Sequence, residues 1–352
     1  MSKDKARRET YLKIHSKLFP EHLSKIIGEE IVESSIKCEL RMFKSDVNKN
    51  GKPIDLYGIT RERGIKVYVE FQIGPSDICN HFEKKIKPII QNIQDGIVIW
   101  VAADFKPGHI TLVKELLKTY PYKLINFYAV QINPRVLDLL SHFKRGDDLH
   151  VYYQLDMINR IGLPPLSLVD DFALQNPPTY IAMPFKEEEN TYYFSNCVDE
   201  NRYLLTKLRK VINYYLNFHT EKESVVNKAL RVSAGKDSIY YDATVCDNAG
   251  KGFVKICFGK SYSKWYQTFK TNNNILKERI SPDIYFNDGK RTISYYLPSS
   301  LNNIPEVVDN LIEVYERFIL FFSPFTYGRR NPTEILNFNF DHYNKSLFKN
   351  TH

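Results

Sequence analysis

Residues 52–77, KPIDLYGITRERGIKVYVEFQIGPSD, determine how the chain is organised. The pattern is typical of two short strands joined by a polar, glycine-containing turn from Thr60 to Gly64. Side chains alternate between the two faces of a strand, so Glu70 and Gln72 share one face of the second strand. Asp55 lies at the start of the first strand. The sequence therefore predicts a hairpin that carries two acidic residues.

A hairpin can bring Asp55 and Glu70 to the same end of a sheet. Two carboxylates held together suit a hard, oxygen-seeking cation such as Mg²⁺. Such an ion can activate water for attack on a phosphodiester and stabilise the charge that develops. Glu70 stands between Val69 and Phe71, where a carboxylate is costly to bury unless it is paired or binds a metal.

The motif Pro53-Ile54-Asp55 followed by Glu70-Phe71-Gln72 resembles the PD-(D/E)XK nuclease signature. Gln72 stands where that family usually has lysine. The resemblance implies that Asp55 and Glu70 bind Mg²⁺ or Mn²⁺ together with the Phe71 carbonyl, and that Gln72 orients the attacking water.

The wider order also resembles a group of uncharacterised two-domain prokaryotic proteins. It runs from the hairpin to a helix opened by His81-Phe82, then to the apolar run Ile97 to Ala103 and Asp104-Phe105. The resemblance implies an α/β fold with a restriction-endonuclease-like mixed sheet core (αβββαβ), followed by an α+β C-terminal domain. We expect a nuclease-like domain over residues 1–162, a proline-rich linker over 163–186 and the second domain over 187–345.

The periodicity of the first half independently predicts an alternation of helices and strands. Helices are expected over 6–17, from 20 onward, over 77–94 and over 111–120, and strands over 36–42, at Asp55, over 66–73, 97–102 and 125–132. A polar turn is expected from Asp46 to Pro53. In the second half the pattern predicts helices over 202–218, 262–273 and 304–322, and strands over 238–247, 253–258 and 291–297.

The resemblance also implies an acidic residue from the first core helices. Glu21 is our choice, although the first turn of a helix favours such a charge for its dipole alone. The rivals are Glu29, Glu30 and Glu33.

Two further sets of residues can be interpreted either as structural or as functional. Lys84, Lys85 and Lys87 either contact phosphate or form a solvated helix face. Aromatic residues of the second half either stack bases or fill a core. They are Tyr240-Tyr241, Tyr262, Trp265-Tyr266 and Tyr295-Tyr296.

Composition limits the class of protein. A formal charge of +8 favours a polyanionic partner. The five cysteines form no Cys-x-x-Cys pair, which argues against a disulfide framework or a zinc site. We expect a cytoplasmic protein that does not span a membrane, because no secretory signal is visible and the densest apolar run, 318–325, is short.

We therefore predict a Mg²⁺- or Mn²⁺-dependent DNA endonuclease with Asp55, Glu70, Gln72 and Glu21 in the site. By analogy with the family, its setting would be restriction or defence against phage. A homodimer or a partner protein from a defence system is compatible with this. The rival is a nuclease-like protein that binds nucleic acid or protein without cutting, and Gln72 is the feature that favours it.

Overall fold

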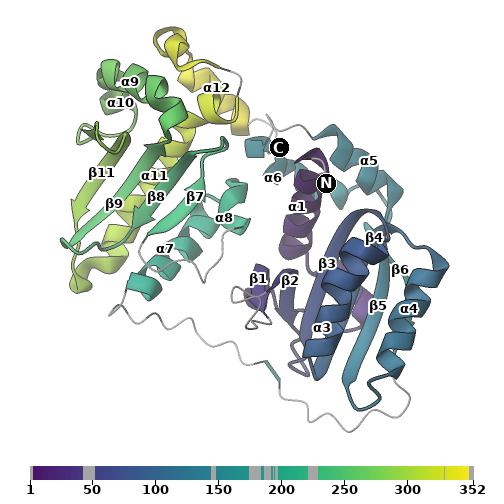
Figure 1. The fold of residues 1–352 in the computed structure, drawn as a ribbon. Coiled ribbons are helices and arrows are strands. Elements are labelled where there is room, and N and C mark those ends of the chain that lie inside the picture. Colours follow the sequence, from purple (N-terminus) through teal and green to yellow (C-terminus); the bar gives the residue numbers. More distant parts are fainter. Residues whose placement is uncertain are drawn as a thin grey trace. The chain divides into compact units, whose positions relative to one another are not determined.

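The structure is a computed structural model that describes residues 3–42, 52–143, 148–173, 184–185, 192, 194, 197–220, 229–328 and 330–348 (Figure 1). The chain forms two compact units. Unit 1 comprises Met1–Phe143 and Gln154–Glu189, and unit 2 comprises Lys144–Tyr153 and Asn190–His352. The turn expected from Asp46 to Pro53 lies mostly outside the described residues, because only 52 and 53 of it are described.

Unit 1 is built on a six-stranded mixed sheet. Its strands follow the chain order β1-β2-β3-β4-β5-β6. The β3–β4 and β4–β5 pairs are parallel and the others antiparallel. The strands are β1 (Lys37–Met42), β2 (Lys52–Ile59), β3 (Lys66–Pro75), β4 (Asp95–Asp104), β5 (Leu124–Ile132) and β6 (Leu166–Phe172).

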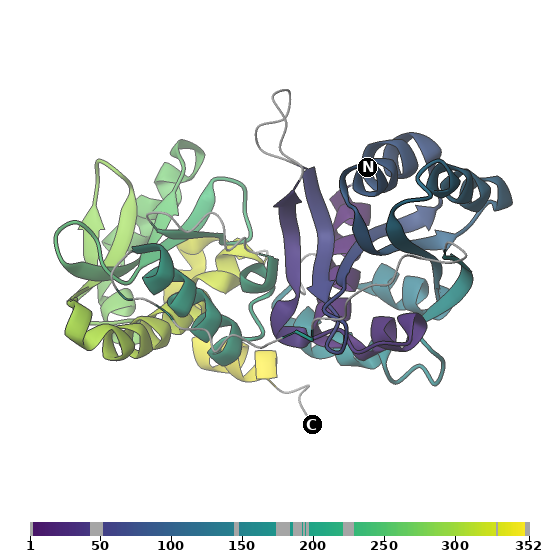
Figure 2. The same ribbon diagram turned by 90° about the horizontal axis from the view of Figure 1, so that it is seen from below.

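Helices cover both faces of this sheet (Figures 1 and 2). They are α1 (Lys3–Leu18), α2 (Glu21–Ile27), the π-helix η2 (Ile78–Ile86), α3 (Lys87–Asn92), α4 (Pro107–Lys118) and α5 (Pro134–His142). One core packs the even-numbered face of β3 and β4, with Tyr68, Val98 and Trp100, against the helices that follow them. Strand β4 is buried on both faces, which explains its continuous apolar sequence.

The helix expected over 77–94 is present over 78–92, but its first part is a π-helix and its second an α-helix. Asp77 caps η2 by accepting a hydrogen bond from the Asn80 N–H. Wide π-helical turns then continue to Ile86, where α3 begins with Pro88 in its first turn. Proline has no N–H and its ring would collide with the carbonyl four residues earlier in a regular helix. The wider turns avoid this collision, and Lys85 lies in the last of them.

The proline-rich stretch expected as a linker contains a strand. Residues Leu166–Phe172 form β6, which pairs antiparallel with β5. Lys114 of α4 also forms an ion pair with Asp170 at 2.7 Å. Apart from Pro184 and Phe185, the rest of the stretch after residue 173 lies outside the described residues.

Unit 2 contains a five-stranded antiparallel sheet of order β10-β11-β9-β8-β7. Its strands are β7 (Leu230–Ser233), β8 (Ile239–Thr244), β9 (Lys251–Phe258), β10 (Tyr285–Asn287) and β11 (Thr292–Pro298). The helices are α6 (Asp148–Leu155), α7 (Cys197–Val211), α8 (Leu216–Thr220), α9 (Ser263–Thr271), α10 (Asn273–Arg279), α11 (Ile304–Thr326) and α12 (Phe340–Phe348). The expected single helix over 202–218 is therefore two helices, and β7 and β10 were not predicted.

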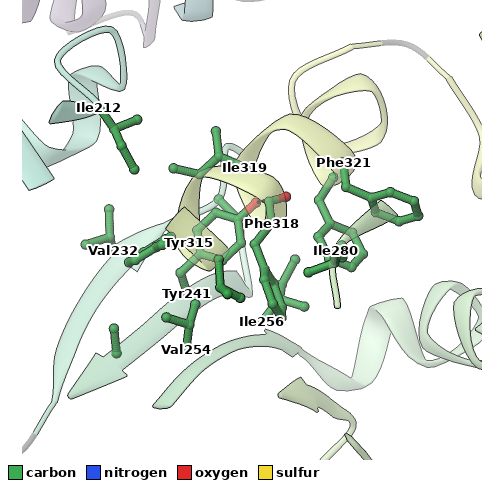
Figure 3. Close-up of a cluster of buried hydrophobic side chains, with 14 of the residues drawn as sticks. Ile212, Val232, Tyr241, Val254, Ile256, Ile280, Tyr315, Phe318, Ile319 and Phe321 are labelled. Carbon is green, nitrogen blue, oxygen red and sulfur yellow. Dashed lines mark hydrogen bonds between the residues drawn. The ribbon is translucent and has the colours of Figure 1, made fainter. Parts of the chain in front are cut away.

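Helix α11 supplies the centre of the second core (Figure 3). Tyr315, Phe318 and Ile319 are fully buried and pack with the inward residues of β8 and β9. The α/β class, the mixed sheet and a second, α+β part are thus confirmed. In the described part of the chain, no helix combines the length and apolar character needed to cross a membrane.

Candidate functional site

Three acidic residues lie at the same level of three neighbouring strands in unit 1. The register on either side places Glu39 of β1 opposite Asp55 of β2. Counting one residue beyond the last β2–β3 pair places Glu70 of β3 at the same level. Negative side chains directly opposite each other in a sheet repel one another, so this level must be compensated by positive charge.

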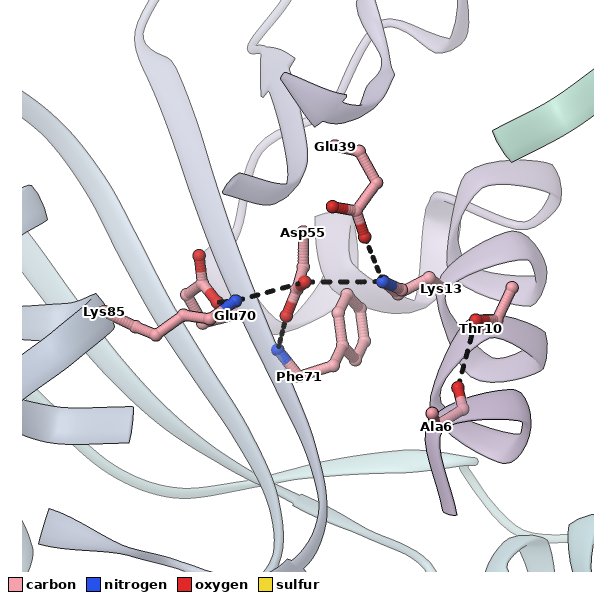
Figure 4. Close-up of polar contacts among 8 residues, drawn as sticks. All are labelled: Ala6, Thr10, Lys13, Glu39, Asp55, Glu70, Phe71 and Lys85. Carbon is pink, nitrogen blue, oxygen red and sulfur yellow. Dashed lines mark hydrogen bonds and ion pairs between the residues drawn. The ribbon is translucent and has the colours of Figure 1, made fainter. Parts of the chain in front are cut away.

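Asp55 is held from both sides (Figure 4). Its Oδ2 accepts a hydrogen bond of 2.9 Å from the Phe71 N–H, so a side chain replaces a main-chain bond of the sheet there. Its Oδ1 lies 3.4 Å from Lys13 Nζ of α1 and 3.4 Å from Lys85 Nζ of η2. Only 2% of Asp55 is exposed.

Glu70 is completely buried. Its Oε2 accepts a hydrogen bond of 2.8 Å from Lys85 Nζ, the ammonium group that also approaches Asp55. Its Oε1 is buried and receives no hydrogen bond from any described residue. The Lys85 ammonium group therefore bridges Asp55 and Glu70, and the two carboxyl groups also hydrogen-bond to each other.

Protonation differs between the two carboxyl groups. Burial and the charge of Asp55 raise the pKa of Glu70 well above its ordinary value, against the opposing effect of Lys85. Burial would also raise the pKa of Asp55, but Lys13, Lys85 and the Phe71 N–H together lower it. Asp55 is thus the stronger acid of the pair.

Glu39 belongs to the same network. It forms a short ion pair with Lys13, the lysine that also contacts Asp55. Its φ angle of 53° lies in the left-handed region, which costs a residue other than glycine about 1–3 kcal/mol. Such strain persists where the surroundings require it, and here it accompanies a side chain paired with Lys13.

Gln72 lies two residues after Glu70 on β3, on the same face of the strand, and is 4% exposed. Its amide Nε2 donates a hydrogen bond of 2.5 Å to the Pro75 carbonyl, and its Oε1 is buried without a donor among the described residues. The β3–β4 register shifts between Gln72 and Pro75. Irregularities of this kind redirect side chains at the ends of strands.

Glu21 is not brought to the site. It is exposed in the first turn of α2, and no hydrogen bond or ion pair among the described residues joins it to Asp55 or Glu70. The rivals Glu29 and Glu30 form ion pairs with Arg63 and Arg61. Glu33 is exposed. The helix dipole accounts for Glu21 sufficiently.

Glu9 of α1, which was not predicted, interacts electrostatically with Asp55, Lys13 and Lys85. It is 9% exposed, and its Oε2 is buried without a partner among the described residues. Burial and the charge of Asp55 raise the pKa of Glu9 to about 7, although Lys13 and Lys85 act in the opposite direction. Glu9 and Lys13 are four residues apart and therefore share one face of α1.

The lysines of the following helix have separate roles. Lys84 Nζ donates to Asn80 at 2.9 Å, and Lys87 pairs with Glu83 at 2.8 Å. Both of these contacts are exposed. Lys85 alone of the three enters the acidic site. Sequence reasoning treated the three alike because it did not predict the π-helix that orients them.

Within the described ranges, no group of three or more His, Cys, Asp or Glu side chains is arranged to hold a metal ion. The oxygen donors at the centre are those of Asp55 and Glu70. Mg²⁺ usually keeps several waters and needs only one or two protein carboxylates, so this pair fits such an ion by the chemistry of its donors.

Comparison with known proteins gives no relative. No protein-family model, curated protein or solved structure matches the chain.

Proposed function

We propose that this chain is a metal-dependent nuclease that acts on DNA. The observation that carries the proposal is the convergence of Asp55 and Glu70, both buried, on a single positive group. Folding two carboxylates together in a protein interior is unfavourable unless a cation is present.

We propose further that unit 1 has the restriction-endonuclease-like fold. The order of its elements supports this: helices α1 and α2, strands β1 to β3, helices η2 and α3, strand β4, helix α4 and strand β5. It includes the αβββαβ order that the resemblance to PD-(D/E)XK nucleases implies. Asp55 and Glu70 occupy neighbouring strands of that arrangement.

Asp55 and Glu70 would hold Mg²⁺ or Mn²⁺, with the Phe71 carbonyl by analogy. The ion would supply an activated water and neutralise charge on the phosphate. Lys85 brings an ammonium group to the same carboxylates. Gln72 occupies the position of the family's usual lysine, and we propose that Lys85 takes the role of that lysine. Glu9 has a pKa of about 7 and so can exchange a proton near neutral pH.

The decisive experiment compares cleavage of plasmid and single-stranded DNA by wild type, Asp55→Asn and Glu70→Gln. Each is assayed with Mg²⁺ or Mn²⁺ and with EDTA. We expect each substitution to reduce cleavage at least about a hundredfold, the scale of one lost electrostatic contact. The double variant should be little worse, since the two residues act as a unit. Glu21→Gln is the control and should cleave normally. Wild-type levels of cleavage by Asp55→Asn would remove Asp55 from the mechanism.

A second candidate function is a nuclease-like protein that binds DNA without cutting it. Lys13 and Lys85 already compensate the carboxylates without a metal, and this observation favours it. Titration of Mn²⁺ into the protein separates the two functions. An enzyme should bind Mn²⁺ and lose that binding in Asp55→Asn, whereas the binding module should take up none in either form.

A further inference from the structure

The sheet of unit 2 has an outer face that its core does not use. Alternation directs Val232, Tyr241 and Ile256 into the core with α11. Figure 1 shows α11 behind β8 and β9. On the opposite side, which we call the outer face, the register aligns one residue from each strand. The row is Arg231, Asp242, Lys255, Ser294 and Tyr285, in the order β7, β8, β9, β11 and β10.

The outer face exposes aromatic rings. Tyr285 is 56% exposed and Tyr296, in the neighbouring row, is 39% exposed. Their ring centres lie 6.4 Å apart, and Phe253 lies 5.8 Å from Tyr296. Neighbouring exposed rings of this kind mark interaction sites more often than isolated ones do.

Positively charged side chains lie over aromatic rings on the same face of the sheet. The Arg231 guanidinium is 4.1 Å from the centre of the Tyr240 ring, and Lys255 Nζ is 4.4 Å from that of Phe253. The buried Asp242 holds both cations, accepting two hydrogen bonds of 2.8 and 3.1 Å from Arg231 and lying 3.6 Å from Lys255. One carboxylate thus fixes two cations beside aromatic rings and leaves a net positive charge.

The charge of the chain is concentrated in this part. Residues 190–352 contain 22 Lys and Arg against 16 Asp and Glu, and so carry +6 of the formal +8. A face that combines rings with positive charge is complementary to a polyanion whose own rings are exposed. The bases of a duplex are stacked inside it, whereas a single strand offers its bases and its phosphates together.

We propose that the outer face of the unit 2 sheet binds single-stranded DNA. Tyr285 and Tyr296 stack on bases, and Arg231 and Lys255 contact the backbone phosphates. This deepens the proposed function by naming the form of substrate held by unit 2. It rests on that function only for the choice of DNA over RNA, because binding by this face requires neither metal nor cleavage.

The test measures binding of a fluorescent oligothymidylate to the full chain by anisotropy, in EDTA so that cleavage plays no part. Tyr285→Ala and Tyr296→Ala should each weaken binding at least about fivefold, since a stacked base contributes about 1–3 kcal/mol. Tyr285→Phe should bind like wild type, because stacking uses the ring and not the hydroxyl. Lys255→Met should reduce the slope of log Kd against log salt by about 0.7. The control is Tyr122→Ala, which removes an exposed ring from unit 1.

Several results would overturn the proposal. They are no binding by wild type at low salt, unchanged affinity in both alanine variants, or equal weakening by Tyr122→Ala. Tighter binding of duplex DNA or of single-stranded RNA would remove the assigned ligand. A change of sedimentation in Tyr285→Ala without a change in affinity would identify the face as a contact between copies.

Circular dichroism checks folding, and Tyr285→Ala remains decisive if Tyr296→Ala fails to fold. Binding is measured in EDTA and cleavage with Mg²⁺ or Mn²⁺, so failure of this site and failure of cleavage are distinguishable.

Discussion

At the scale of single residues, the site is a balance between buried carboxylates and two lysines from different helices. Lys13 compensates Asp55 and Glu39, while Lys85 compensates Asp55 and Glu70. Removing one partner of a buried pair leaves the other charge uncompensated, and this usually costs more than the pair contributed. The two lysines therefore stabilise the fold around the buried carboxylates.

Replacing Lys85 tests this balance. Lys85→Met should destabilise the chain in EDTA by about 3 kcal/mol, the low end for buried pairs, because 29% of the lysine side chain is exposed. Mg²⁺ or Mn²⁺ should restore part of the loss, since the ion replaces the missing positive charge. Urea unfolding with and without the metal provides the measurement. Lys84→Met, at an exposed contact with Asn80, is the control. A loss that the metal leaves unchanged would contradict a cation site at the carboxylates.

Glu9 predicts a dependence of stability on pH. In the folded chain it keeps its proton up to about pH 7, whereas an ordinary glutamate in the unfolded chain loses it near 4.5. The folded state binds more protons between these values, so Glu9 makes stability fall as pH rises from 4.5 to 7. Glu9→Gln should therefore raise the free energy of unfolding above pH 7 by up to about 3 kcal/mol, and should change little below 4.5. Unfolding at both pH values in EDTA, with Glu21→Gln as the control, measures this. Equal effects at both pH values would contradict it.

The sequence indicated part of this residue-level picture. Asp55 and Glu70 could be paired from the hairpin pattern alone, since a strand alternates with a fixed period. Glu9 could not, because charged residues occur all along α1 (KDKARRETYLKIHSKL) and the pattern does not show which of them is buried. Its buried polar residues Glu9 and Lys13 do lie four apart, and that spacing was the available signal.

At the scale of elements, the strands that form from local alternation were predictable and those that depend on a partner were not. Strand β6 follows Pro164-Pro165 and is buried mainly at Leu166. Its sequence is therefore typical of a linker. It forms because β5 offers a free edge. The π-helical turns of η2, which precede Pro88, were likewise not predicted.

The role of β6 can be tested with fragments of unit 1. A fragment ending at residue 162, the boundary expected from sequence, lacks β6 and leaves the edge of β5 unpaired. We expect it to aggregate and to exchange its β5 amide hydrogens rapidly, because open sheet edges pair with other chains. A fragment ending at residue 173 should stay monomeric and protect those amides. Sedimentation and hydrogen exchange are the measurements, and identical behaviour of both fragments would show that β6 is dispensable.

At the scale of the whole molecule, charge and chemistry are divided between the two units. Residues 1–189 contain 27 Lys and Arg and 25 Asp and Glu, a net charge of +2, although they hold the candidate site. The positive balance that composition associated with a polyanion therefore belongs mainly to the second half. Sequence could predict two parts from chain length, but not that Lys144–Tyr153 belongs to unit 2. That assignment depends on tertiary contacts such as the burial of Leu149 in the second core.

Separate cores predict separate unfolding. Each unit has its own hydrophobic core, so a calorimetric scan of the full chain should show two transitions. Mg²⁺ should raise only the transition of unit 1, because ligand binding stabilises the part that binds it. Phe318→Ala removes a fully buried ring at the centre of α11 and should cost unit 2 about 3–5 kcal/mol, lowering only the other transition. Asp55→Asn should abolish the Mg²⁺ shift and leave the Phe318-sensitive transition in place. A single transition that both Mg²⁺ and Phe318→Ala displace would mean that the two units unfold together, and the assignment of the metal to unit 1 would then rest on the titration alone.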